Sequence, residues 1–338
     1  MAAVTLGFAL PAAAQVVPAP LVDRSSAAQS PAERVSAARQ VVGAPLPAES
    51  LTTTDTGLTL GRAQSRMTVP VSIAAAGPWG FIIDTGAERT VVSRELAGEL
   101  KLQPGPTVNI VAMTGASAVP TVIVPSLSVS SVSATTVTAP ALEQRDLGAP
   151  GMLGIDALQG HRVDIDFARS SMMVNPSRKR FVRAGTHGDE VVVVAKSLYG
   201  QLIVTDARWR DRRIAVVIDT GSSMTVGNPA LLAMMGERAR PVGPTTAVSV
   251  TGATLNADVY LVDDLAIGGI GLDGVSVAFA DAAPFRRFGL TKRPALMLGM
   301  DTLRMFRRVR IDFANRDITF TMPQGGGDGL ILDRHEGA

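Results

Sequence analysis

Two apolar runs in this chain end in the same three residues. The run Phe81-Ile82-Ile83 is followed by Asp84-Thr85-Gly86, and the run Val216-Val217-Ile218 is followed by Asp219-Thr220-Gly221. Short apolar runs that end at turn residues are typical of buried strands. Each strand therefore delivers a carboxylate into a turn at the end of a rigid element, where reactive side chains often lie.

The hydrophobic and polar pattern around both tripeptides predicts the same elements in the same order. A strand is expected before each one, over residues 67–73 and 201–205. Helix-capping residues follow each one and predict short helices over 93–102 and 228–235. The two aspartates are 219 − 84 = 135 residues apart, and a two-fold fold would bring them face to face.

Further features repeat after the tripeptides. Gly115 and Gly252 each lie in a turn between apolar strands, 115 − 84 = 31 and 252 − 219 = 33 residues after the aspartates. Leu153-Gly154-Ile155-Asp156 matches Leu298-Gly299-Met300-Asp301. Counting further strand positions, six features recur in one order, which indicates an internal repeat. We therefore predict an all-β fold: two similar β-barrel-like lobes related by pseudo-two-fold symmetry, with a few short helices.

The composition agrees with a strand-rich globular protein. Of 338 residues 46% are hydrophobic, and 33 Gly and 21 Pro with abundant Val and Thr favour short strands separated by turns. This length accommodates two lobes. We predict an N-terminal lobe at 55–176, a linker at 177–189, a C-terminal lobe at 190–323 and a tail at 324–338.

Two local motifs are interpreted as ordinary structure. The segment Gly269-Ile270-Gly271-Leu272-Asp273-Gly274 fits the spacing of a dinucleotide-binding loop, but the residues after it, 275–279, predict a strand and no helix. We interpret it as a hairpin turn. The basic stretch Arg178-Lys179-Arg180 lies between the two repeats, and we interpret it as part of a solvated linker.

The N-terminal residues predict export. An apolar stretch followed by Ala12-Ala13-Ala14 is similar to the end of a secretory signal peptide, so residues 1–14 are interpreted as one, and the mature protein is expected to be periplasmic or secreted. The stretch is too short to span a membrane. Residues 15–54 are interpreted as an Ala- and Pro-rich linker with one short helix at 31–42.

Charge and chemistry-bearing residues narrow the function classes. The formal net charge is only +2, so nucleic acid is not expected as a partner. The chain has no Cys, which excludes disulfides and thiolate chemistry. Its three His lie far apart without metal-ligand spacing, which disfavours a zinc site or a Ser-His-Asp triad. We predict no metal and no cofactor.

Taken together, both tripeptides, both glycine-centred hairpins and both Leu-Gly-x-Asp segments resemble the aspartic proteases, and within them the bacterial retropepsin-like family. The resemblance covers about residues 67–322. The chain resembles a retropepsin dimer fused into one polypeptide, because each half keeps its own flap-like hairpin.

The resemblance implies roles for named residues. It makes Asp84 and Asp219 the catalytic pair, and it implies that hydroxyl-to-backbone bonds from two threonines hold the loops together. It implies that two glycines let the backbone turn close under the carboxylates, and that two hairpins close over an extended peptide. The threonines are Thr85 and Thr220, the glycines are Gly86 and Gly221, and the hairpin residues are Thr114, Gly115, Thr251 and Gly252.

The implied activity is that of an aspartic endopeptidase. Two carboxylates close together share one proton, so one can take a proton from water while the other donates to the scissile carbonyl oxygen. The expected partner is a polypeptide substrate, and the protein is expected to be a monomer. The alternative is an inactive module of the same fold that captures peptides by strand addition. The chain keeps all six tripeptide residues, which favours the enzyme.

Overall fold

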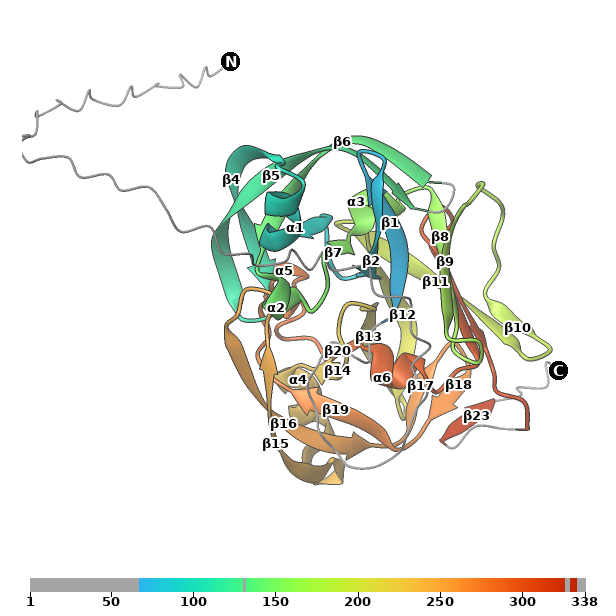
Figure 1. The fold of residues 1–338 in the computed structure, drawn as a ribbon. Helices are drawn as coiled ribbons and strands as arrows, with labels where there is room; N and C mark the ends of the chain where they lie inside the picture. Colours follow the sequence, from blue (N-terminus) through green and yellow to red (C-terminus); the bar gives the residue numbers. More distant parts are fainter. Residues whose placement is uncertain (1–66, 130–131, 326–328, 333–338) are drawn as a thin grey trace, which may run out of the picture. The chain divides into compact units, whose positions relative to one another are not determined.

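A computed structural model describes residues 67–129, 132–325 and 329–332 (Figure 1). These residues belong to one structural unit that spans Leu58–Ala338. The predicted signal peptide at 1–14 and the predicted helix at 31–42 lie outside the described residues. Within the described ranges, no helix has both the length and the apolar character needed to cross a membrane.

The first half forms a seven-stranded sheet in the order β1-β2-β7-β3-β6-β5-β4. Its strands are β1 (Thr68–Ile73), β2 (Ala76–Ile83), β3 (Val91–Ser93), β4 (Gln103–Ala112), β5 (Gly115–Val129), β6 (Val132–Leu142) and β7 (Gly151–Leu153). The end of β5 pairs back onto β1, so the sheet curls toward a barrel. The last three residues of β2 are all buried, as the apolar run before the first tripeptide predicts.

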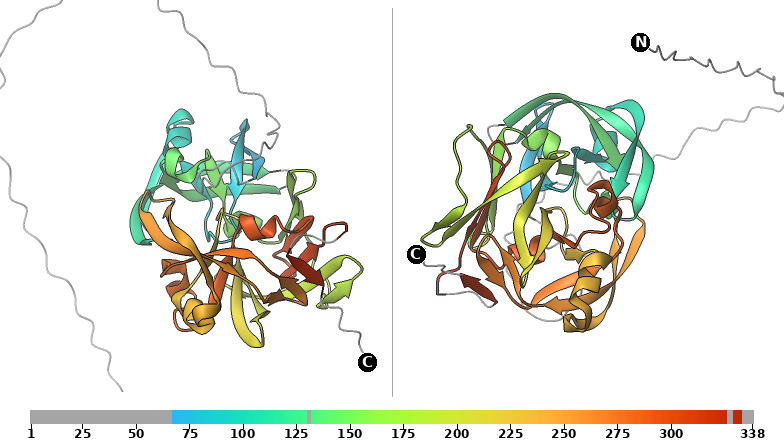
Figure 2. Two further views of the ribbon diagram at one scale, coloured as in Figure 1. Left: turned by 90° about the horizontal axis from the view of Figure 1, so that it is seen from below. Right: turned by 180° about the vertical axis from the view of Figure 1, so that it is seen from behind.

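The second half repeats this strand order as β12-β13-β20-β14-β19-β16-β15. Its strands are β12 (Gln201–Trp209), β13 (Arg212–Ile218), β14 (Thr225–Gly227), β15 (Arg240–Val248), β16 (Thr254–Val262), β19 (Val275–Phe279) and β20 (Ala295–Leu298). The pairing directions also match, since β2 runs parallel to β7 and β13 runs parallel to β20. The predicted all-β fold with two similar halves is confirmed, and Figure 2 shows both halves from two further sides.

The glycine-rich segment in the second half is a hairpin, as predicted. It runs through β18 (Ile270–Leu272), which pairs with β17 (Leu265–Ile267), and it leads directly into the strand β19. The chain beyond residue 323 adds one more strand here, because β23 (Leu330–Leu332) pairs with β18.

Strands from both halves form a joint sheet in the order β9-β8-β21-β22-β11, with β10 beside β11. The strands are β8 (His161–Asp166), β9 (Ser171–Pro176), β10 (Gly185–His187), β11 (Glu190–Leu198), β21 (Arg308–Asp312) and β22 (Asp317–Thr321). One face of the β8–β21 pair is apolar and fully buried, with Val163, Ile165, Val309 and Ile311. The other face carries ion pairs between the halves.

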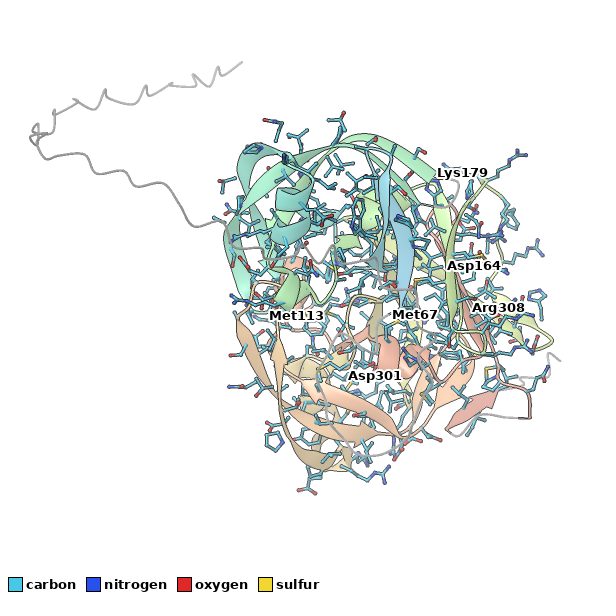
Figure 3. All side chains as sticks on the ribbon, in the orientation of Figure 1. Met67, Met113, Asp164, Lys179, Asp301 and Arg308 are labelled. Atoms are coloured by element: carbon cyan, nitrogen blue, oxygen red, sulfur yellow. The ribbon has the colours of Figure 1, made fainter. Side chains whose placement is uncertain are left out.

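These ion pairs follow the strand register. Arg308 lies opposite Asp166 and Arg310 opposite Asp164, with nitrogen–oxygen distances of 2.8 and 2.9 Å. Figure 3 labels one residue of each pair, Arg308 and Asp164. The hydrogen bond from Arg308 holds the pKa of Asp166 below its usual value. Because these side chains are partly exposed, each pair stabilises the fold by at most about 1 kcal/mol, and the apolar face contributes more.

The segment between the halves is more ordered than the sequence predicted. Phe181 is 83% exposed, as expected for a solvated linker. Arg180, however, forms ion pairs with Asp312 and Asp317 at 3.5 and 3.3 Å. Both carboxylates are buried, and unpaired buried charge is costly, so the arginine is held in place. Arg180 is therefore half exposed, as a linker residue can be, and also anchored, a contact that the sequence interpretation did not include.

Short helices join the strands. They are α1 (Arg94–Glu99), α2 (Gln144–Leu147), α3 (Ile155–Leu158), α4 (Pro229–Met235), α5 (Ala283–Arg287) and α6 (Met300–Leu303). Ser93 caps α1 by accepting from Leu96 N, and Asn228 caps α4 by accepting from Leu231 N. The two predicted helices thus begin at their predicted caps, although α1 ends at residue 99, before the predicted end at 102.

Candidate active site

The two tripeptides meet at the carboxyl ends of β2 and β13. Asp84 N donates to Leu153 O at 2.9 Å, and Asp219 N donates to Leu298 O at 3.0 Å, so each parallel strand pair extends into the tripeptide. A side-chain hydrogen bond joins Asp84 and Asp219. The structure therefore brings together the two aspartates that the sequence singled out, 135 residues apart.

The two threonines of the tripeptides bind each other's loops. Thr85 N donates to Thr220 Oγ1 at 3.2 Å, and Thr220 N donates to Thr85 Oγ1 at 3.1 Å. Thr85 Oγ1 donates to Ile218 O at 2.8 Å, and Thr220 Oγ1 donates to Ile83 O at 2.7 Å. Both threonines are buried, so this reciprocal set works in a low-dielectric setting and fixes one loop relative to the other.

Each carboxylate is also held by its own loop. One oxygen of each aspartate accepts two backbone hydrogen bonds, which fixes the carboxylate plane. The donors are Gly86 N (2.7 Å) and Ala87 N (3.0 Å) to Asp84 Oδ1, and Gly221 N (3.0 Å) and Ser222 N (3.1 Å) to Asp219 Oδ1.

Each tripeptide glycine lies against the carboxyl group of the opposite half. A Cβ on Gly86 would lie 2.9 Å from Asp219 Cγ, and a Cβ on Gly221 would overlap Asp84 Cγ. Neither glycine has a positive φ. Glycine is therefore required at both positions for space, and backbone conformation does not demand it.

Burial raises the pKa of Asp219 far above its usual value, to about 8. The nearby charge of Asp84 and the side-chain hydrogen bond to it act in the same direction, while the backbone N–H groups of Gly221 and Ser222 oppose them. Two carboxyl groups this close titrate as a pair, so the raised value means that the pair keeps one proton at neutral pH.

This raised pKa predicts a pH-dependent stability. A carboxyl group with a folded-state pKa above its unfolded value binds more protons in the folded state, so its contribution is present at about pH 4 and is lost as the pH rises toward 8. We expect Asp219→Asn to raise the melting temperature relative to wild type by about 3 °C or more at pH 8, and by less at pH 4. Calorimetry across this range measures the difference.

Asp166→Asn is the matched control for the stability prediction. The pKa of Asp166 is lowered, so its contribution is lost as the pH falls, which is the opposite direction. If the difference in melting temperature between wild type and Asp219→Asn is the same at every pH, the pair does not share a proton.

Two further residue pairs position the loops that carry Asp84 and Asp219, the two aspartates called the dyad below. Thr90 Oγ1 donates to Asp156 Oδ1 at 2.7 Å, and Thr225 Oγ1 donates to Asp301 Oδ1 at 2.7 Å (Figure 3 labels Asp301). The same threonine oxygens accept from the backbone N–H of the Leu-Gly-x-Asp glycines, Gly154 at 3.2 Å and Gly299 at 3.0 Å. The repeated Leu-Gly-x-Asp segment thus anchors each dyad loop.

The sequence interpretation missed the two anchoring threonines. Thr90 and Thr225 each lie six residues after a dyad aspartate, 90 − 84 and 225 − 219. This equal spacing inside the repeat was the available signal. Both threonines are fully buried, which agrees with a positioning role.

A cleft of about 860 Å³ lies over the two aspartates. Its walls come from two hairpins, β4–β5 in the first half and β15–β16 in the second, through residues 109–113 and 245–250. At its rim, Glu88 of the first half forms an ion pair with Arg287 of α5, whose guanidinium lies 4.4 Å from the Tyr199 ring centroid. Both halves therefore contribute to the floor, walls and rim.

The predicted flap residues lie at the tips of these hairpins. Thr114 lies in the turn before β5 and Gly115 is the first residue of β5, while Thr251 and Gly252 lie in the turn between β15 and β16. In the part of the chain that the structure describes, the hairpin residues that line the cleft are 109–113, 245–250, Leu255 and Ala257, and not these four. Their contact with substrate stays a prediction.

Each hairpin tip rests on the opposite half. Ala283 N, at the start of α5, donates to Met113 O at 2.9 Å, and Met113 lies where the two halves meet (Figure 3). Val250 packs on an apolar cluster of the first half that contains Leu147, and a Cβ on Gly252 would lie 2.8 Å from Asp146 Oδ2. The hairpins thus close the cleft by reciprocal contacts.

The tip glycines allow a second prediction. Gly252 has φ +80° and is close to Asp146, whereas Gly115 has φ +141° and open space around it. We expect Gly252→Val to lower kcat/KM by about tenfold, more than Gly115→Val, because the valine strains the turn and also displaces the tip from Asp146. Gly160→Val, with φ +76° and open space in an exposed turn, is the control for strain alone. If all three valine variants lose activity and melting temperature to the same extent, the two tip glycines act only as ordinary turn residues.

Comparison with known families agrees with this geometry. Residues 69–160 match the family described as gag-polyprotein putative aspartyl protease, and residues 205–302 match the family described as aspartyl protease. The first match contains Asp84 and the second contains Asp219. The chain belongs to the retropepsin-like aspartic proteases and carries two such lobes in tandem. No curated protein matches the chain.

Proposed function

We propose that this chain is an aspartic endopeptidase that hydrolyses peptide bonds with Asp84 and Asp219 as its catalytic pair. The observation that carries the proposal is the hydrogen-bonded pair itself, at the floor of a cleft and with a raised pKa at Asp219. A fold with no chemistry to perform gains nothing from two carboxyl groups held this close, because their mutual repulsion is destabilising.

The chemistry follows from the shared proton. The ionised member of the pair takes a proton from a water molecule, whose oxygen bonds to the scissile carbonyl carbon, while the protonated member donates to the carbonyl oxygen. When the resulting diol collapses, a proton passes to the amide nitrogen and the carbon–nitrogen bond breaks. The products are a carboxyl group and an amine, and the pair again holds one proton.

The cleft supports an extended polypeptide as the substrate. Its walls are strands of two hairpins, and an extended chain can lie between them and pair with their backbone groups. The two hairpins wall the cleft over the aspartates, so a bound polypeptide displaces water from the pair.

Digestion of denatured casein from pH 3 to pH 9, with and without a statine-containing peptide, tests the proposal. We expect cleavage that the statine peptide blocks and that declines as the pH rises toward the raised pKa of about 8, where the pair loses its shared proton. Peptide binding without cleavage at any pH would replace the enzyme by the inactive peptide-binding module.

We also propose that the enzyme is an exported monomer. One chain supplies both aspartates, so the site needs no second copy. Light scattering coupled to gel filtration measures the mass. N-terminal sequencing of protein recovered from the periplasm or medium should begin near Gln15, and an intact Met1 in the cytosol would overturn export.

A further inference from the structure

Gln201 is held next to the dyad by a tight hairpin. It is the first residue of β12 and pairs with Leu198 across a two-residue turn, Tyr199-Gly200, in which both residues have positive φ. Such turns suit the twist of a hairpin and fix its register. A Cβ on Gly200 would lie 2.7 Å from Ile155 Cγ2, so the turn of the second half is seated against the first half.

The Gln201 side chain has one satisfied end and one open end. Its Nε2 donates to Gly86 O at 3.0 Å, across 115 residues of sequence. Since a carbonyl oxygen needs a donor, this bond fixes which way the amide points. Its Oε1 is buried and has no hydrogen-bond partner among the described residues, and it is the single buried side-chain nitrogen or oxygen atom in that part of the chain with this property. The residue is 2% exposed and lines the cleft.

We propose that Gln201 Oε1 accepts a hydrogen bond from a backbone N–H of the bound polypeptide, next to the scissile bond. This inference rests on the proposed peptidase function. Gly86, whose carbonyl oxygen accepts from Gln201, lies against the Asp219 carboxyl group. The Gln201 side-chain amide is therefore anchored to a residue that touches the catalytic pair. Oε1 can only accept, and an extended polypeptide presents a donor N–H at every residue except proline.

An ordered water is the other partner that a buried oxygen such as Oε1 can have, and the experiments below distinguish it from a substrate N–H. Buried polar atoms are nearly always paired, and an unpaired one is destabilising. Fixing Gly86 needs only the Nε2 donor, so that role explains the amide nitrogen of Gln201 and leaves the amide oxygen without a role. A substrate N–H supplies the partner that the described residues do not, once the bound polypeptide has displaced the atoms that shield Oε1 from solvent.

A double-mutant cycle between enzyme and substrate tests the assignment. The probe is the best-cleaved peptide from the casein digest, N-methylated at one residue at a time for three residues on each side of the scissile bond. We expect methylation at one position to lower wild-type kcat/KM by about tenfold, chiefly through KM, since it removes the donor. In Gln201→Met the same methylation should cost less than about twofold.

Leu202→Ala is the matched control variant. Leu202 is the next residue on β12, is 2% exposed in the core and does not line the cleft. It should lower the melting temperature while the methylated position keeps its full tenfold effect. If methylation effects in Gln201→Met equal those in wild type at every position, the Gln201 assignment is wrong and the peptidase stands.

Two further outcomes separate the proposals. If wild type cleaves no peptide, the peptidase proposal fails, and the same cycle is measured as affinity for a statine peptide and its N-methyl derivatives. An effect of methylation that is smaller in Gln201→Met than in wild type then supports the Gln201 assignment. Equal effects in both proteins overturn the assignment. If Gln201→Met does not fold, a crystal structure of wild type with the statine peptide decides. A peptide N–H within about 3.2 Å of Oε1 supports the assignment, and a bridging water or no contact overturns it.

Discussion

Asp84→Asn will lower turnover by about a thousandfold or more while the affinity for a peptide stays within a few-fold of wild type. Asparagine has the shape of aspartate and can keep an accepting oxygen toward Gly86 N and Ala87 N. It cannot carry or release the shared proton, so the loss falls on the chemical step. Single-turnover kinetics gives the rate, and fluorescence polarisation with a statine peptide gives the affinity.

Asp219→Asn should behave in the same way, and the double variant should be little worse than either single one. Both carboxyl groups serve one water molecule, and groups that act as a unit have strongly non-additive effects. Asp166→Asn, which changes a carboxylate in the joint sheet, should keep nearly full activity. Substantial turnover in either dyad variant would end the aspartic-protease mechanism for this chain.

Gly221→Ala will lower kcat by about a hundredfold or more with a smaller loss of peptide affinity. The new methyl group would overlap Asp84 Cγ, so the Asp84 carboxyl group must move out of the plane in which it meets Asp219. A displacement of about 1 Å at a reacting group costs about two orders of magnitude in rate. Gly86→Ala should be milder, because there the methyl group would lie 2.9 Å from Asp219 Cγ.

Gly98→Ala is the control for this prediction. Gly98 lies in α1, and no atom lies within 4 Å of the position that an alanine methyl group would take, so alanine should be neutral or stabilising there. The dyad pKa gives a second readout, because separated carboxyl groups no longer share a proton. Wild-type kcat and an unchanged pH profile in Gly221→Ala would show that the carboxyl groups are not packed as described.

The sequence was most informative where it repeats. The tripeptides, their apolar strands and the Leu-Gly-x-Asp segments specify two similar sheets, because each motif fixes a strand end and the order of motifs fixes the order of strands. The same repetition places Asp84 and Asp219 in equivalent positions, so the pair could be named in advance. The distance between the two aspartates could not be predicted, since it depends on the hydrogen bonds that the threonines make between the halves.

Residues that act across the halves escaped prediction. Gln201 contacts Gly86, and Arg180 contacts Asp312 and Asp317, through tertiary contacts with no local sequence signal. The resemblance assigned substrate contact to Thr114, Gly115, Thr251 and Gly252, whereas the hairpin residues that line the cleft are 109–113, 245–250, Leu255 and Ala257.

The joint sheet determines how the proposed activity responds to dilution. A retropepsin built from two separate chains has its dyad only while the chains stay associated, so its specific activity falls below the dissociation constant. Here β8 and β21 are hydrogen-bonded strands of one chain, and each half is present to the other at the high effective concentration of an intramolecular contact. Specific activity should therefore stay constant as the enzyme is diluted to about nanomolar concentration, and it should return by a first-order process after unfolding.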